Sequence, residues 1–297
     1  MQFKVLPIIT LLLLLFSCKF SSGSDTQHIN AYQSGSSNLA HYNFEKPDNI
    51  IKLSAFLTEI SGLSFNSANN NLLAINDEQG LIYELNPTTG EILSQQKFGS
   101  TGDYEGVEKV GNNIYIVKSN GDIYKKTPTE TVKIETRLSL KNDVEGLGYD
   151  TTNKQLLVSC KAKTLSEKDP KGSKAVYSFN LAKEKLNKEP FLLIKRKKVS
   201  KLIKNDGGSK KAEDRAKGFS PSGIAVHPIT KHVYIVSAVE SMMLVYSLEH
   251  KPIQCVFFDK SKIPQPEGIC FSPDGTLFVS TEGHGTRGRI FVYSSIH

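Results

Sequence analysis

Hydrophobic and polar residues alternate in short runs along this chain, and one phrase recurs after residue 58. Each copy holds a glycine preceded by an acidic or small polar residue, as in DYEGVEKV and DVEGLGYD. A turn and a second apolar run, such as NIYIVK or HVYIVS, follow every copy. Alternation with a period of two predicts β-strands, and no stretch of useful length shows a helical period. The copies cover residues 59–66, 103–110, 143–150, 220–227 and 265–272.

The spacing of these phrases indicates the architecture. Their glycines are separated by 44, 40, 77 and 45 residues. Four short strands in about 40–45 residues is the spacing of one β-propeller blade. The long interval holds two insertions, residues 161–174 and 196–218, so it needs no sixth blade. The repeated glycines are Gly62, Gly106, Gly146, Gly223 and Gly268.

The two ends of the repeat region complement each other. The fifth copy stops after a third strand at residues 291–293, while an unassigned apolar run at residues 50–57 precedes the first copy. Pairing these runs completes the last blade and removes a free strand edge. The sequence therefore predicts an all-β fold, a five-bladed β-propeller closed by an N-terminal strand, with a basic loop insertion at residues 196–218.

The repeated glycine has a physical reason. The innermost strands of a propeller crowd around its axis, and a residue without a Cβ lets their backbones approach. The position two residues later is also small in most copies, and Glu108 is the exception. The small residues at that position are Ser64, Gly148, Ala225 and Cys270.

The first residues predict the cellular address. An apolar run of twelve residues ends at Phe16, which is too short for a bilayer that takes about 20. Residues 1–17 resemble a bacterial lipoprotein signal with Cys18 as the acylated first residue of the mature protein; an ordinary cleaved signal is the alternative. Residues 18–47, rich in Ser, Gly and Asn, are expected to be a flexible tether, and residues 48–297 the propeller. We expect a lipid-anchored protein of the bacterial cell envelope that faces the periplasm or the exterior.

The cysteines beyond the signal are odd in number, so at most one disulfide can form. Each lies in an apolar strand pattern, which favours buried, reduced thiols. They are Cys160, Cys255 and Cys270.

The net charge of +7 is local. Residues 195–217 hold ten Lys or Arg and three Asp or Glu, so the rest of the chain is balanced. No aromatic residue in this segment is available to stack on bases, and a nucleic-acid partner is not expected. The segment is either a solvated insertion or a contact for anionic lipid or lipopolysaccharide. The candidate anion contacts are Arg196, Lys197, Lys198 and Lys201.

Acidic residues gather just before the repeated glycines. Strand side chains repeat every two residues, so the positions one and three residues before each glycine are expected to face one mouth of the channel. Carboxylates at such range raise one another's pKa or recruit cations, and all-oxygen ligands suit Ca²⁺ better than zinc. Alternatively, the acids accept hydrogen bonds from loop N–H groups, or Lys118 and Lys161 neutralise them. The predicted metal ligands are Glu105, Glu145, Glu267, Asp103, Asp143 and Glu59.

A Gly-rich loop at residues 282–289 offers His284 and two arginines. It is either a site for an anionic substrate or a plain hairpin turn, and the second is the simpler interpretation. The sequence contains no HExxH, CxxC, GxSxG or P-loop spacing.

Together these phrases resemble the SdiA-regulated (YjiK-like) family of secreted bacterial propellers. The resemblance runs over residues 57–293 and is carried by EISGL, INDEQGLIYEL, DYEGVEKV, DVEGLGYD, PSGIAVHPITKHVYIVS and PEGICFSPDGTLFVSTEG. It implies a periplasmic or surface propeller with calcium as an occupant. The chain departs from the family at residues 237–240, where SAVE stands in place of an acidic Ser-Asp-Glu.

Two classes of function follow. The first is a membrane-tethered propeller that binds a ligand or partner, and Ca²⁺, at the central channel. The second is a metal-dependent hydrolase of phosphoester or lactone substrates, in which channel carboxylates hold the metal. The absence of a nucleophile-and-base spacing favours the first.

Overall fold

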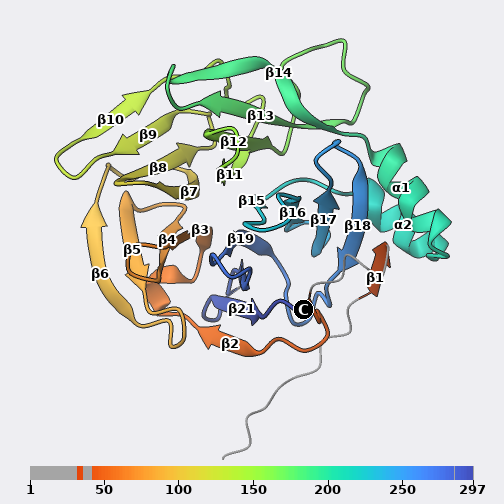
Figure 1. The fold of residues 1–297 in the computed structure, drawn as a ribbon, viewed down its shortest axis with the longest axis horizontal. Helices are drawn as coiled ribbons and strands as arrows, with labels where there is room; N and C mark the ends of the chain where they lie inside the picture. Colours follow the sequence, from red (N-terminus) through yellow and green to blue (C-terminus); the bar gives the residue numbers. More distant parts are fainter. Residues whose placement is uncertain (1–31, 36–41, 284, 297) are drawn as a thin grey trace, which may run out of the picture.

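The computed structural model describes residues 32–35, 42–283 and 285–296, and its strands form a ring of antiparallel sheets (Figure 1). The five sheets are the blades of a five-bladed β-propeller, as predicted. The predicted signal at residues 1–17 and Cys18 lie outside the described residues. From the axis outward, the blades are β3 (Ile60–Asn66), β4 (Asn71–Asn76), β5 (Leu81–Leu85) and β6 (Ile92–Lys97); β7 (Tyr104–Val110), β8 (Asn113–Lys118), β9 (Ile123–Lys126) and β10 (Thr131–Ile134); β11 (Val144–Asp150), β12 (Gln155–Cys160), β13 (Lys174–Asn180) and β14 (Lys185–Ile194); β15 (Gly223–Val226), β16 (Val233–Ser237), β17 (Met242–Tyr246) and β18 (Pro252–Phe257); and β19 (Pro266–Phe271), β20 (Leu277–Thr281), β21 (Arg289–Tyr293) and β2 (Asn49–Lys52).

The predicted closure is confirmed. Strand β2 pairs antiparallel with β21, with Ile51 opposite Ile290, so the N-terminal strand is the outer strand of the last blade. The strand ends earlier than residue 57 because Ala55–Leu57 turn into a 3₁₀ helix. Ser54 caps this helix by accepting a hydrogen bond from the Phe56 N–H at 3.5 Å.

The repeated glycines lie where the inner strands touch. A Cβ on Gly106 would lie 2.7 Å from the backbone nitrogen of Leu147, and one on Gly268 would lie 2.9 Å from that of Leu63. Both distances are shorter than van der Waals contact, so a side chain would force neighbouring blades apart. Since Gly268 belongs to the last blade and Leu63 to the first, the ring is closed at its axis as well as at its rim.

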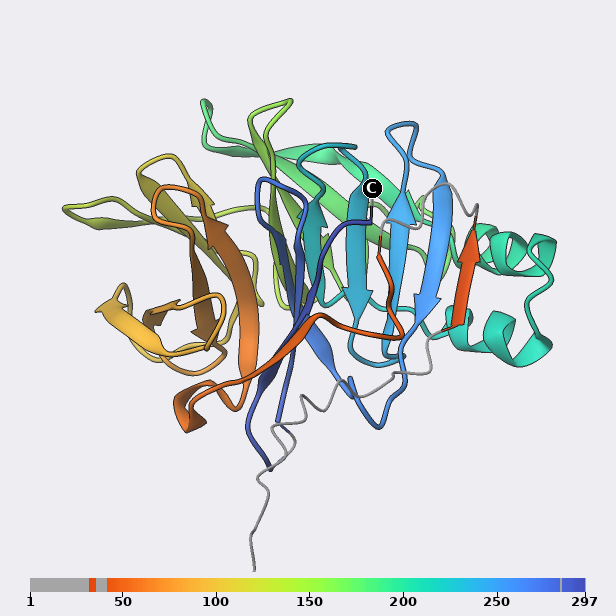
Figure 2. The ribbon, with the colours of Figure 1, turned by 60° about the horizontal axis from the view of Figure 1, so that its bottom comes forward.

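Part of the segment expected to be a tether belongs to the folded ring. Strand β1 (Tyr32–Gly35) pairs antiparallel with β18 and extends the fourth blade at its outer edge (Figure 2). Tyr42 and Phe44 are buried between the fourth and fifth blades. The Tyr42 hydroxyl donates to the Gly275 carbonyl at 2.6 Å. These aromatic contacts stabilise the approach to β2 by removing apolar surface from water.

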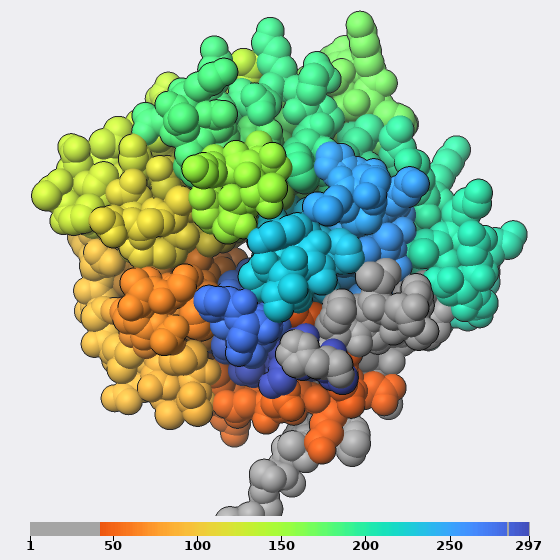
Figure 3. All heavy atoms as spheres, viewed as in Figure 1, coloured from red at the N-terminus to blue at the C-terminus, as the bar shows by residue number. Residues whose placement is uncertain are grey.

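The basic insertion at residues 196–218 is helical rather than a loop, which corrects the prediction. It forms α1 (Arg196–Asn205) and α2 (Lys210–Lys217), which lie beside β18 (Figure 1). The atoms of this segment, teal in Figure 3, project from the rim of the molecule. Every fourth residue on the inner side of these helices is apolar and buried against the fourth blade. Neither helix, nor any other in the described part of the chain, is long and apolar enough to cross a membrane. The buried helical residues are Val199, Ile203, Ala212 and Ala216.

The prediction of reduced thiols is confirmed. Cys160, Cys255 and Cys270 are all free and buried. Burial raises the pKa of each thiol, to about 12 for Cys160, so each stays protonated at neutral pH.

Closure of the ring by β2 predicts that Ile51, the buried residue of this strand, contributes to the stability of the fold. Ile51 is 3% exposed, whereas its neighbour Lys52 is exposed. Ile51→Ala should lower the free energy of unfolding by about 2–5 kcal/mol, because it opens a cavity between the first and last blades. Lys52→Ala should change it by less than about 0.5 kcal/mol. Chemical denaturation of both variants checks this, and equal effects would contradict the role of β2.

Candidate functional site

A β-bulge places an acidic residue at the start of several inner strands. Tyr104 pairs with Lys118 and Gly106 with Val117, so Glu105 is an extra residue without a partner across the ladder. Glu145 is the extra residue of β11 in the same way. A bulge turns its side chain out of the regular alternation. We call this end of the channel the acidic mouth, made by Glu105, Glu145, Glu267, Asp103 and Asp143.

Three glutamates meet at the acidic mouth. A small cavity of about 10 Å³ on the axis is lined by Glu105, Glu267 and the glycine stretches of the inner strands. Glu145 and Glu267 are each 8% exposed. Glu145 and Glu267 interact electrostatically with each other and with Glu105, as expected from the position of each acid next to a repeated glycine.

Burial together with like charge disfavours ionisation of these acids. Burial raises the pKa of Glu105 to about 10, with further contributions from the Glu145 charge and from a hydrogen bond with Asp103. Burial and the Glu145 charge raise the pKa of Glu267 well above its usual range. At neutral pH the Glu105 carboxyl is therefore protonated in the protein by itself, and ionisation of Glu267 is disfavoured.

One lysine neutralises part of the cluster. Lys161 Nζ lies 2.8 Å from Glu145 Oε1. Burial raises the pKa of Glu145 to about 7 even though Lys161 lowers it. The Lys161 backbone carbonyl accepts from Ser220 Oγ at 3.1 Å, which holds the residue at the junction of the third and fourth blades.

Asp77 belongs to this mouth although the sequence analysis missed it. It lies just after β4 and is part-buried, and its Oδ1 has no hydrogen-bond partner among the described residues. Burial and the Glu59 charge raise its pKa. The sequence carried a signal for this position. Asp77 is the first residue after the second strand of its blade, β4, and Lys161 is the first residue after the second strand of its own blade, β12. Aligning the two blades would therefore have placed Asp77 at the same mouth as Lys161.

The remaining predicted residues have other roles. Glu59 and Asp103 are exposed at the edge of the mouth. Asp143 has a backbone φ of 54°, in the left-handed region. The predicted neutraliser Lys118 lies over the Tyr104 ring, 5.3 Å from its centroid. In the first blade, Ser61 takes the place of the acid before the repeated glycine, and its Oγ donates to the Tyr104 carbonyl of the next blade at 2.7 Å.

The arrangement of these acids bears on whether they could hold a metal ion. Within the described residues, no group of three or more His, Cys, Asp and Glu side chains is arranged to hold a metal ion. The side chains as they lie do not form a coordination shell for Ca²⁺, since Lys161 holds Glu145 and Asp103 shares a hydrogen bond with Glu105. Calcium at this mouth stays a prediction.

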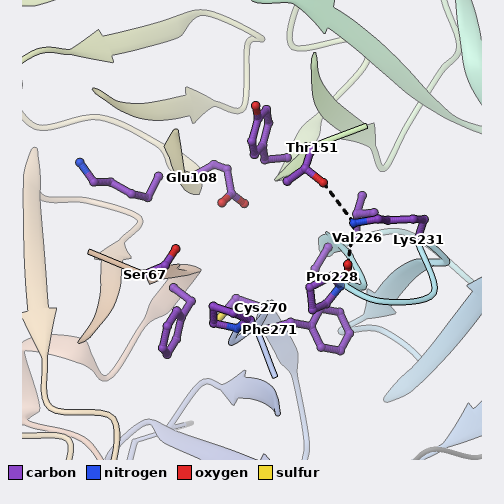
Figure 4. Close-up of a pocket in the computed structure, with 13 residues that line it drawn as sticks. Ser67, Glu108, Thr151, Val226, Pro228, Lys231, Cys270 and Phe271 are labelled. Atoms are coloured by element: carbon purple, nitrogen blue, oxygen red, sulfur yellow. Dashed lines mark hydrogen bonds between the residues drawn. The ribbon is translucent and has the colours of Figure 1, made fainter. Parts of the chain in front are cut away.

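The opposite end of the channel holds a larger cavity that the sequence did not predict. Its volume is about 400 Å³, and residues from all five blades line it (Figure 4). We call this end the pocket mouth. Its floor contains Glu108 and Cys270, and the Lys231 ammonium reaches over it.

The predicted anion contacts divide into two kinds. Arg196 is partly buried and donates to the Phe219 carbonyl at 3.3 Å, which ties α1 to the fourth blade. Lys197, Lys198 and Lys201 are exposed on α1. Of the four predicted contacts, these three lysines present their charge to solvent.

The Gly-rich loop near the C-terminus forms a turn. The Thr286 N–H donates to the Gly283 carbonyl at 2.8 Å, and Gly283 N–H donates to Thr58 at the same distance. Arg289 packs over the Phe291 ring. His284 lies outside the described residues.

Comparisons with known proteins agree with this architecture. The family model described as SdiA-regulated matches residues 36–284. The glutaminyl cyclase of Myxococcus xanthus is similar in structure, with a TM-score of 0.53 at 13% identity over 84% of this chain and 97% of that chain. A PQQ-bound aldose sugar dehydrogenase from Streptomyces coelicolor has a TM-score of 0.47 at 11% identity, over 83% of this chain and 98% of that chain. No curated protein matches the sequence. At 13% identity the glutaminyl cyclase structure indicates the fold alone.

The buried acids predict a pH dependence of stability. Glu105 has a pKa of about 10 in the fold, above the usual value of about 4.3, so folding favours its protonated form. Its contribution is complete below pH 4.3 and is lost as the pH rises towards 10. Glu105→Gln should therefore be more stable than the wild type at pH 9, and the difference should shrink at pH 5. Melting temperatures across this range measure it, with the exposed Glu91→Gln on an outer loop as a control that should show no such trend. A difference that does not grow with pH would contradict the burial of this acid.

Proposed function

The chain belongs to the SdiA-regulated family of β-propellers, and we propose that it is a membrane-tethered, extracytoplasmic binding propeller whose acidic mouth takes a cationic group. The observation that carries the proposal is the imbalance of charge at that mouth. Glu105, Glu267 and Asp77 have no ion-pair partner among the described residues, and the one ion pair there joins Lys161 to Glu145. A cation supplied by a ligand or a partner protein would supply the missing charge.

Binding of a cation here is coupled to protons. Burial disfavours ionisation of Glu105 and Glu267, and a positive charge between them favours it. A cationic ligand should therefore displace protons and bind more tightly as the pH rises. The Asp77 oxygen without a hydrogen-bond partner is a ready acceptor for an ammonium N–H.

Two kinds of cation satisfy this chemistry. An organic ammonium needs only hydrogen-bond acceptors, which the carboxyls supply where they lie. Ca²⁺ needs six to eight oxygens, so Glu105, Glu145 and Glu267 would have to turn towards one another and release Lys161. We favour the ammonium for that reason, and Ca²⁺ forms the second arm of the test.

The test uses the double variant Glu105→Gln, Glu267→Gln, which keeps the Lys161–Glu145 pair. Spermidine or Ca²⁺ at 100 times its dissociation constant should stabilise the wild type by about 2.7 kcal/mol. The double variant should lose this increment while its stability without ligand is unchanged or higher, because it removes two buried acids whose ionisation is opposed by burial and by the neighbouring negative charge. Thermal melts with each cation and with a chelator measure both quantities.

A matched control carries the same number of substitutions away from the channel. Glu91 and Glu130 are exposed on outer loops. Glu91→Gln, Glu130→Gln should keep the full increment. A wild type indifferent to both cations would overturn the proposed function.

The membrane tether is the second part of the proposal. Its support is the lipoprotein-type sequence around Cys18 and the exposed lysines of α1, Lys197, Lys198, Lys201 and Lys204, which suit an anionic lipid surface. Multiple acyl chains contribute about 0.8 kcal/mol per buried CH₂, enough for stable anchoring. The protein would then face the periplasm or the exterior of a bacterial cell envelope.

Acylation is tested in cells with a fatty-acid analogue. The wild type should take up the label and fractionate with membranes. Cys18→Ala should do neither, because it lacks the acceptor thiol, whereas Ser17→Ala keeps the cysteine and should be labelled. An unlabelled wild type would contradict the tether and leave the channel proposal standing.

A further inference from the structure

The cavity at the pocket mouth plays no part in the proposed function, and it is the largest feature of the central channel. Its volume of about 400 Å³ is within the range of small-molecule sites. The repeated glycines of the inner strands lie between this cavity and the acidic mouth, so a ligand in the cavity meets a different set of side chains.

The floor of the pocket carries a single carboxyl among small residues. At the position two after the repeated glycine, Glu108 replaces the small residue that the other blades have. It reaches into the space that they leave at the axis (Figure 4). The small neighbours are Ser64, Gly148, Ala225 and Cys270.

Glu108 is already supplied with hydrogen-bond donors. Ser64 Oγ donates to its Oε1 at 2.9 Å, and the backbone N–H groups of Lys109 and Tyr149 donate to it as well. Burial nevertheless raises its pKa to about 8. At neutral pH the carboxyl is therefore mostly protonated and offers an O–H to a ligand.

The charge over the pocket is positive. Lys231 Nζ donates to Thr151 Oγ1 at 3.4 Å and to the Pro228 carbonyl at 2.5 Å. An ammonium has three N–H donors, so a third remains for a ligand. Figure 4 shows the Lys231 ammonium and the Glu108 carboxyl pointing into the same space from opposite sides. Lys109 also lines the pocket, where burial lowers its pKa although Glu84 raises it.

Aromatic rings make the walls rigid and apolar. Phe65 stacks on Phe278 with 6.0 Å between centroids, and Phe271 packs against Tyr234 at 5.0 Å. Because these rings are fixed from behind, Phe65 and Phe271 present preformed apolar surface to the cavity.

We propose that this pocket binds a small organic anion with a ring-sized apolar body, its anionic group between Lys231 and Glu108 and its ring against Phe65 and Phe271. An anion is favoured over an amine because the lysines outnumber the acid and because Glu108 already has its donors. The apolar body is required because a bare inorganic anion would leave the aromatic walls in contact with water.

Binding should weaken as the pH rises. The titratable groups that face Glu108 are Cys270 and Tyr149, whose pKa values are raised by burial, together with Lys109 and Lys231. Ionisation of Glu108 above pH 8 puts a negative charge beside the bound anion. Glu108→Gln keeps the hydrogen-bonding capacity without this charge, so it isolates the contribution of Glu108 from that of Lys109.

The test measures binding of benzoate and phenyl phosphate by calorimetry, with benzylamine and benzyl alcohol as probes of matched shape. The wild type should bind the two anions, and up to about tenfold more weakly at pH 9 than at pH 7, because a carboxyl with a pKa of about 8 loses most of its proton over this range. Glu108→Gln should bind them with a much smaller change over this range. Lys231→Met should weaken binding tenfold or more, because it removes the ammonium and keeps the length of the side chain.

Lys154→Met is the matched control. Lys154 has a positive φ of 49° like Lys231 at 62°, and it is exposed outside the pocket. Its substitution should leave anion binding unchanged. Melting temperatures of all variants separate lost binding from lost folding.

Two results would overturn the proposal: binding of benzylamine in preference to benzoate, or no binding of either anion by the folded wild type. The double variant of the acidic mouth should still bind benzoate, so failure here and failure of the proposed function are distinguishable.

Discussion

The close approach of the inner strands at five glycines is the constraint on which the rest of the structure depends. A Cβ at Gly106 or Gly268 would enter the backbone of the neighbouring blade, so these contacts fix how near the blades come to the axis. The channel is therefore narrow along the glycine stretches next to the acidic mouth, where the cavity is only about 10 Å³. Polar chemistry can develop only where the strands diverge, at the two mouths.

This constraint makes the acidic mouth a source of instability in the folded protein. Several strands start within a small circle, so acids at their starts cannot move away from one another. The outcome is visible in Glu105, which shares a hydrogen bond with Asp103, and in Glu145, which depends on Lys161. Buried acids without counter-ions oppose folding, and local conflicts of this kind are expected where a protein binds something.

Much of the fold could be predicted from the sequence because its strands follow from local hydrophobic patterns that recur along the chain. The period of two gave the strands, and the unpaired runs at residues 50–57 and 291–293 gave the closure. The helices α1 and α2 were missed because their apolar faces consist of few residues, Val199 and Ile203 in the first, among many lysines. Their helical state depends on burial against the fourth blade, which no local pattern reports.

The sites were predictable only in part, for the same reason. Glu105, Glu145 and Glu267 stand beside a repeated glycine, so their convergence followed from the repeat. The pocket mouth has no motif, because Phe65, Lys231 and their neighbours come from different blades and turns. It exists only after the ring has closed.

The β-bulge connects the two mouths to one strand. In a regular strand, residues three apart point to opposite faces, so Glu105 and Glu108 could not both face the channel. The extra residue at position 105 shifts the register between Tyr104 and Gly106, and both carboxyls then face the axis, one on each side of the glycine. Strand β7 therefore carries an acid to both mouths, but their surroundings differ. Glu105 lies among other carboxyls, whereas Glu108 lies among small residues, backbone N–H groups and lysines. Because the glycine backbone of the inner strands lies between them, each mouth has its own electrostatic surroundings: carboxyls gather at one mouth, and lysines outnumber the single carboxyl at the other.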